Sequence, residues 1–127
     1  MVRLYFREYT MTTDGWLNLL EVAMGTFLWI MYGTLGASTA SEQFLYGCAC
    51  AFTANGCVFL LSSIMSIQTA LMLPRLFYYT LFQLIAAGCY IFGGVGSIGN
   101  SSIIDGITAI VCGGFHFVHF IYSMLKN

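Results

Sequence analysis

Residues 76–98 read LFYYTLFQLIAAGCYIFGGVGSI and contain no charged side chain. A helix needs about 20 mainly apolar residues to cross the hydrocarbon core of a bilayer, so this stretch predicts a membrane-spanning helix. Three further runs of similar length and character lie near residues 16–36, 44–67 and 103–125. The sequence therefore predicts an all-α fold, in which residues 1–127 form one integral membrane domain, a four-helix antiparallel bundle.

The composition supports a membrane environment. Hydrophobic residues make up 59% of the 127 residues and charged residues only 7%, whereas soluble domains contain about 25% charged residues. The formal net charge is −1, with only four Lys and Arg residues. Nucleic-acid binding needs several basic contacts to phosphate, so we expect no nucleic-acid partner. The expected partners are the lipid bilayer and other integral membrane proteins.

The four basic residues indicate the orientation of the bundle. Arg3, Arg7, Arg75 and Lys126 each lie at the end of an apolar run, and alternating spans place all four on one face. The positive-inside bias makes that face cytoplasmic, so both termini are predicted to be cytoplasmic. Aromatic side chains are predicted at the same interface, at Trp16, at residues 77–79 and at Tyr122.

Few polar side chains lie within the predicted spans, and such groups are functional or packing candidates by default. Glu21 lies five residues into the first span and His119 about six residues from the end of the last. Antiparallel packing of these helices would bring Glu21 to His119, with Asn18 one turn shallower and His116 one turn deeper. The alternative is that Glu21 extends to the interface while both imidazoles make ordinary interhelical hydrogen bonds.

The last span carries a stripe at helical spacing. Asp105, Thr108, Cys112, His116 and His119 share one face, which must pack against protein rather than lipid. A thiol and two imidazoles facing Glu21 resemble zinc or copper ligands, but no second helix supplies a His or Cys at a matching depth. We predict no metal and no cofactor. No nucleophile with a base is found outside the spans, so the protein is predicted not to be an enzyme.

Small residues allow helices to approach closely within a membrane. The candidates for helix packing are Ala51 and Asn55 in the second span, Gly88 in the third and Gly113 in the fourth. Packing within one bundle is favoured over a dedicated dimer face, although a homo-oligomer is possible. Asn100-Ser101-Ser102 fits the glycosylation sequon, but a tight turn between spans predicts that Asn100 is not modified.

The pattern of spans resembles that of MARVEL-type membrane proteins. Residues 16–25 resemble the leucine- and glutamate-bearing entry helix of that family, and residues 109–123 resemble its closing helix of small and aromatic residues. The third span begins with an aromatic stretch after Leu73-Pro74. The resemblance implies a non-enzymatic scaffold that associates laterally with lipids and membrane proteins in trafficking, membrane apposition or cell junctions. It also implies the plasma membrane or endomembrane vesicles rather than the mitochondrial inner membrane.

Two other functions fit the same pattern. An accessory subunit of a larger respiratory, pump or channel complex would also carry few charges and many small and aromatic residues. The sequence around Glu21 is also similar to the first helix of small multidrug transporters, in which a glutamate exchanges protons for a cationic drug. Members of that family often insert in both orientations. In this chain all four basic residues are predicted on one face of the bundle, which argues against a transporter of that family.

Overall fold

The computed structural model describes residues 6–99 and 103–126, and every regular element in those ranges is a helix. The four long helices are α2 (Thr13–Leu35), α3 (Ala40–Met65), α5 (Phe77–Gly99) and α6 (Ile103–Lys126). Their bounds lie within a few residues of the four predicted runs. The prediction for Asn100 falls outside the described residues.

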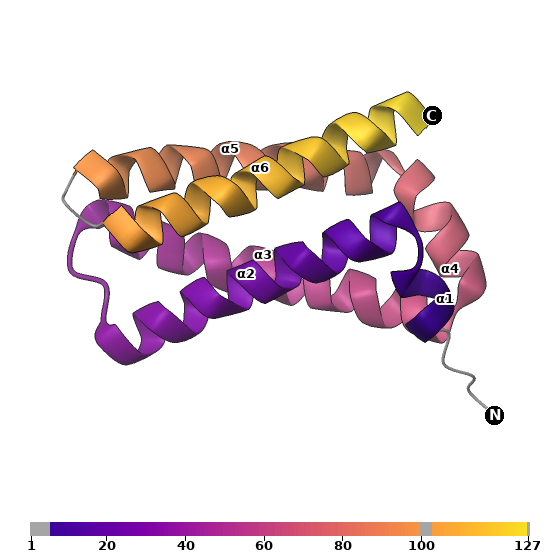
Figure 1. The fold of residues 1–127 in the computed structure, drawn as a ribbon, viewed down its shortest axis with the longest axis horizontal. Helices are drawn as coiled ribbons and strands as arrows, with labels where there is room; N and C mark the ends of the chain where they lie inside the picture. Colours follow the sequence, from indigo (N-terminus) through magenta and orange to yellow (C-terminus); the bar gives the residue numbers. More distant parts are fainter. Residues whose placement is uncertain (1–5, 100–102, 127) are drawn as a thin grey trace.

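The four long helices lie alongside one another, and successive ones run in opposite directions (Figure 1). Helix α2 packs against α3 and α6, and α5 packs against the same two helices. The N-terminal end of α2 and the C-terminal end of α6 therefore lie at one end of the bundle. Three short elements are found at that end as well: α1 (Phe6–Thr10), α4 (Ile67–Met72) and the 3-10 turn η1 (Leu73–Arg75).

Three of the described helices are long and apolar enough to cross a membrane, namely α3, α5 and α6. Helix α2 has a similar length but does not meet the same standard of apolarity. Asp14, Asn18 and Glu21 lower the hydropathy of its first half. The described chain thus has three helices of the kind found in integral membrane proteins.

Polar caps explain where the helices begin and end. The Thr12 side chain accepts a hydrogen bond from the Gly15 amide, 3.0 Å away, and caps α2. Helix α2 ends at Gly36, whose φ of 87° suits a residue without a Cβ. Ser66 both ends α3 and caps α4 by accepting from the Thr69 amide. The expected linker between the second and third spans is therefore mostly helical.

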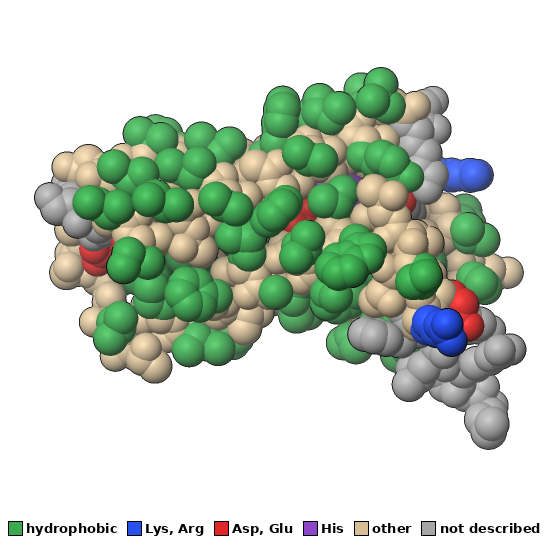
Figure 2. Space-filling model, viewed as in Figure 1, with side chains coloured by type: hydrophobic (Ala, Val, Ile, Leu, Met, Phe, Trp, Pro, Cys, Tyr) green, Lys and Arg blue, Asp and Glu red, His purple; other side chains and the backbone are tan. Residues whose placement is uncertain are grey.

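Large apolar side chains occupy the outside of the bundle as well as its core. Leu28 and Leu45 are fully buried, whereas Phe27 is 50% and Phe92 76% exposed. Figure 2 shows hydrophobic side chains over the whole visible face. On that face the basic side chains gather at the end where α1 and α4 lie (Figures 1 and 2). An apolar outer surface of this extent matches a protein surrounded by hydrocarbon.

Glycine contacts set the distance between α5 and α6. A Cβ atom on Gly94 would lie 2.7 Å from the Gly106 carbonyl oxygen, and one on Gly113 would lie 3.0 Å from that of Ala87. Such distances leave no room for a side chain without moving a backbone. Gly113, predicted as a packing residue, therefore lies at a close contact between α5 and α6.

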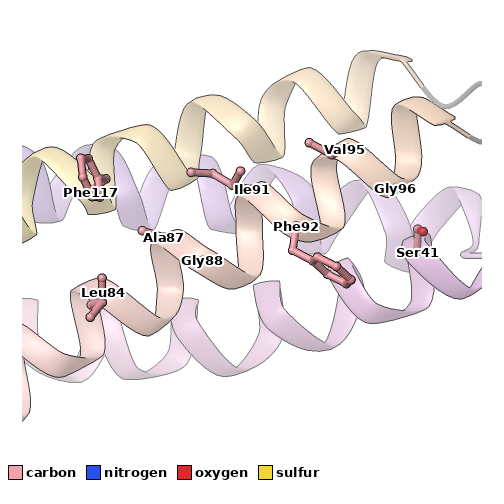
Figure 3. A pocket seen from close by; sticks show the side chains of 9 residues that line it. All are labelled: Ser41, Leu84, Ala87, Gly88, Ile91, Phe92, Val95, Gly96 and Phe117. Atoms are coloured by element: carbon pink, nitrogen blue, oxygen red, sulfur yellow. The ribbon is translucent and has the colours of Figure 1, made fainter.

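Two other predicted packing residues lie elsewhere. Ala51 is exposed, and a Cβ on Gly88 would meet no atom within 4 Å. Gly88 lies in an outer groove of about 680 Å³ lined mainly by α5 (Figure 3). Helical periodicity explains the difference, since the inward face of α5 is the one that carries Gln83, Ala86 and Tyr90. Asn55 does join two helices, because its Nδ2 donates to the Tyr78 hydroxyl at 3.2 Å.

Candidate functional site: a buried carboxylate–imidazole cluster

A polar cluster lies inside the bundle near the end where α1 and α4 are found. Helix α2 contributes Asp14, Asn18 and Glu21, which are spaced by four and three residues and so share one face. Helix α6 contributes His116 and His119, and α5 contributes Tyr79 and Gln83. All seven side chains are at most 4% exposed.

His119 is the centre of the cluster. Its Nδ1 lies 2.9 Å from Glu21 Oε1, and its Nε2 lies 3.0 Å from Asp14 Oδ1. The Tyr79 hydroxyl is also 3.0 Å from Nε2. Because each ring nitrogen faces a carboxylate, the form that donates to both is the doubly protonated imidazolium. His119 thus joins α2, α5 and α6 through charge-assisted hydrogen bonds.

His116 has a different environment. Its ring stacks on Tyr90, with centroids 5.5 Å apart and an interplanar angle of 14°. Its Nδ1 lies 2.6 Å from the Gln83 amide. The Gln83 nitrogen fits this position, because it then donates to His116 Nδ1 and to both Glu21 oxygens at 3.2 and 3.3 Å. If the Gln83 oxygen occupied this position, it would face the Glu21 carboxylate oxygens. His116 therefore accepts a hydrogen bond as a neutral imidazole.

Three side chains carry the charges of the cluster. Asp14 and Glu21 supply two carboxylates, while His119 is the one imidazolium that faces them. His116 Nδ1 is 3.5 Å from Glu21 Oε2, but this nitrogen carries no proton when it accepts from Gln83. His116 therefore adds no positive charge to the ion pairs that His119 makes with Glu21 and Asp14.

Asn18 extends the cluster to α1. Its Nδ2 donates to the Tyr9 hydroxyl at 3.2 Å. Burial raises the pKa of Tyr9, and the nearby carboxylates of Asp14 and Glu21 raise it further, while the hydrogen bond from Asn18 lowers it. Tyr9 therefore stays a neutral phenol. Asn18, predicted to lie beside the Glu21–His119 pair, instead bonds to a helix that the sequence pattern does not predict.

A second buried contact joins α2 to α6 at the opposite end of the bundle. The Tyr32 hydroxyl donates to Asp105 Oδ2 at 2.6 Å. The predicted inward stripe of α6 is thus occupied at both ends, by Asp105 and by His119, and Cys112 between them is fully buried. These two contacts hold the same pair of helices in one register.

The structure brings Glu21, His116 and His119 together as predicted from the sequence, places Asn18 about one turn away on α2, and adds other residues. Asp14 precedes the run predicted to form the first span, but it is buried in the first turn of α2. Its position two helical turns before Glu21 is the signal that could have identified it. Tyr79 is predicted to lie at the membrane interface, whereas it is fully buried against His119. No sequence signal separates Tyr79 from its exposed neighbour Tyr78.

The geometry of the cluster pairs opposite charges between helices. In residues 6–99 and 103–126, no group of three or more His, Cys, Asp and Glu side chains has the arrangement that would hold a metal ion. The Cys112 thiol points to the Glu21 backbone oxygen, 3.9 Å away, and not to the imidazoles. What the cluster can do is fix α2 against α5 and α6 within a medium of low dielectric constant.

Comparison of the chain with protein-family models, with curated proteins and with solved structures gives no match.

Proposed function

We propose that the protein is a non-enzymatic four-span membrane scaffold that works by lateral association with lipids and other membrane proteins. The observation that carries the proposal is the apolar outer surface of the long helices. Phe27, Phe92 and Val118 are each about half exposed or more, and they come from α2, α5 and α6. Outside the long helices the described chain has only α1, α4 and η1, so the lateral surface is what a partner can contact.

Helix α2 completes the proposed set of four spans. Its polar side chains face the bundle interior, whereas Phe27, Trp29 and Ile30 face outward. A helix with an inward polar cluster can lie in a bilayer when its polar groups are paired inside the protein. The proposal agrees with the resemblance to MARVEL-type proteins and with a role in trafficking, membrane apposition or junctions at the plasma membrane or on vesicles.

The same surface would serve an accessory subunit of a larger membrane complex. Proton-coupled transport through Glu21 has less support, because its carboxylate is 3% exposed and is held by His119 and Gln83. A transported cation would need access to that carboxylate.

Photo-crosslinking in the native membrane tests lateral association. A photoreactive amino acid at Phe27 should give adducts with other membrane proteins, because this side chain is 50% exposed. The same group at the adjacent Leu28, which is fully buried, is the matched control and should react only within the chain. Several different adducts favour a scaffold, whereas one stoichiometric partner favours a subunit. Adducts with lipid alone at Phe27, Phe92 and Val118 would contradict both.

Cysteine labelling tests the proposed orientation. The basic residues Arg7 and Arg75 lie in α1 and η1, at the end that the positive-inside bias makes cytoplasmic. A cysteine replacing the exposed Gln68 of α4 should therefore react with an impermeant maleimide only after the membrane is opened. A cysteine replacing Ser38, between α2 and α3, should react in intact cells. The reverse pattern would place both termini on the outside.

A further inference from the structure

A second groove on the outside of the bundle has a basic side chain at one end. Its volume is about 530 Å³, and it lies between the first turns of α5 and the last turns of α6. Arg75, the last residue of η1, lines this groove, which is called the Arg75 groove below. The helices contribute Phe77, Thr80, Leu81 and Leu84 from α5, and Phe120 and Met124 from α6.

The walls of the Arg75 groove are apolar. Each wall is one continuous helix face, because the lining residues of α5 and of α6 are three or four positions apart or adjacent. Thr80 is the one polar residue on these walls, and its hydroxyl donates to the Leu76 carbonyl oxygen at 3.5 Å. Leu84 also lines the outer groove of Figure 3, so the two grooves adjoin along α5.

Arg75 gives the groove a positive charge at the end that the positive-inside bias makes cytoplasmic. Its side chain is exposed, and none of the ion pairs among the described residues includes it. The described residues that line the groove include no acidic side chain. Helix α6 ends at Lys126, so the sequence supplies a second basic residue at the same end. These charges favour an anion beside Arg75.

The depth of the groove suits one leaflet of a bilayer. The hydrocarbon core is about 30 Å thick, so each leaflet is about 15 Å deep. Helix α5 rises about 1.5 Å per residue and therefore covers about 10 Å from Phe77 to Leu84. Beyond Leu84 the outer groove continues along the same helix. An extended acyl chain that begins at Arg75 therefore reaches the middle of the bilayer within the two grooves.

A phospholipid matches both the charge and the walls. Its phosphate can pair with a guanidinium, which presents a fork of N–H donors to the phosphate oxygens. Its acyl chain can cover the apolar walls, which a soluble anion would leave bare. A membrane helix is about 10 Å across with its side chains, so it would lie over the groove and not enter it.

We propose that the Arg75 groove binds one anionic phospholipid of the cytoplasmic leaflet, with its phosphate at Arg75 and one acyl chain between α5 and α6. That leaflet carries the anionic lipids that attract basic side chains. The inference rests on the proposed lateral association with lipids, and it adds the class of lipid and the place where it binds.

Fluorescence quenching by brominated lipids measures binding in this groove. The full-length protein with Trp16→Phe, Trp29→Phe and Phe120→Trp carries its one tryptophan on the α6 wall. It is placed in phosphatidylcholine vesicles with a small fraction of dibrominated phosphatidylserine, or with the same fraction of dibrominated phosphatidylcholine as the matched control. We expect phosphatidylserine to bind about fivefold more tightly, as for one basic contact at an anionic membrane surface. Met124→Trp, on the same wall, is the second reporter.

Two arginine variants assign the preference to the groove. Arg75→Gln should reduce the fivefold preference to about one. Arg7→Gln is the matched control, because Arg7 is an exposed basic residue in α1 that does not line the groove, and it should keep the preference. A reporter that retains the natural Trp29 of α2 as its one tryptophan should show no preference.

Three results would overturn the proposal. Equal quenching by the two lipids at both reporters would show that the groove does not select an anionic lipid. A preference that survives Arg75→Gln, or that falls equally in Arg7→Gln, would assign it to the overall charge of this end. Absence of quenching by either lipid would show that protein covers the groove. None of these results removes lateral association, which fails if photo-crosslinking at Phe27 gives adducts with lipid alone.

Discussion

Replacing His119 with alanine should lower the free energy of unfolding by about 3–5 kcal/mol, the cost of removing one partner from a buried ion pair. His119 is fully buried, and its two nitrogens face Glu21 and Asp14 at 2.9 and 3.0 Å. Without the imidazolium, the Glu21 and Asp14 carboxylates would lose the positive charge that faces them both. The loss should greatly exceed the value of about 0.6 kcal/mol that is typical of an interhelical hydrogen bond in a membrane.

Reversible unfolding in mixed micelles, followed by circular dichroism, measures this loss. Val118→Ala is the matched control, because Val118 precedes His119 in α6 and is 54% exposed. The triple change Asp14→Asn, Glu21→Gln and His119→Gln removes all the charges and should recover most of the stability, because replacing every member of a buried ionic group is far less costly than removing one. If His119→Ala and Val118→Ala lose the same amount, the cluster does not hold the bundle together.

The long helices can be predicted from the sequence because apolar run length is a strong signal. All four runs become helices, with bounds shifted by a few residues at caps such as Thr12 and Thr39. Helices α1 and α4 cannot be predicted in this way. They have five and six residues, too short for a periodic pattern, and they form because Tyr9 and Ser66 find tertiary or capping partners.

The candidate site is predictable only in part, because the sequence gives the depth of a residue in a span but not the rotation of the helix. Helical spacing and equal depth are enough to pair Glu21 with His119, because both depend only on counting residues along two spans. The inclusion of Asp14 and Tyr79 depends on where α2 and α5 begin and on how they are rotated. Tyr79 is fully buried while Tyr78 is 59% exposed. Composition alone would place both tyrosines at the interface.

The same dependence on rotation separates the glycines of α5. Both Gly88 and Gly94 are small residues in one apolar helix, and the sequence-based prediction names Gly88 as the packing residue. In the bundle, Gly94 faces α6, where Gly106 and Ile110 leave it no space. Gly88 faces the outer groove. The contribution of each glycine to stability therefore depends on whether it faces α6. The same substitution at Gly88 and at Gly94 can measure this difference.

Gly94→Val should lower the free energy of unfolding by roughly 1–3 kcal/mol, the usual cost of overpacking, whereas Gly88→Val should stay within about 0.5 kcal/mol. At Gly94 even the first added carbon would lie 2.7 Å from the Gly106 carbonyl oxygen and 3.2 Å from the Ile110 amide nitrogen, so a backbone must move. At Gly88 nothing lies within 4 Å. Both variants receive the same β-branched side chain, so the intrinsic helix propensity cancels in the comparison. Unfolding in mixed micelles gives both values. An equal loss in the two variants would mean that propensity, and not the close approach of α5 to α6, sets the cost.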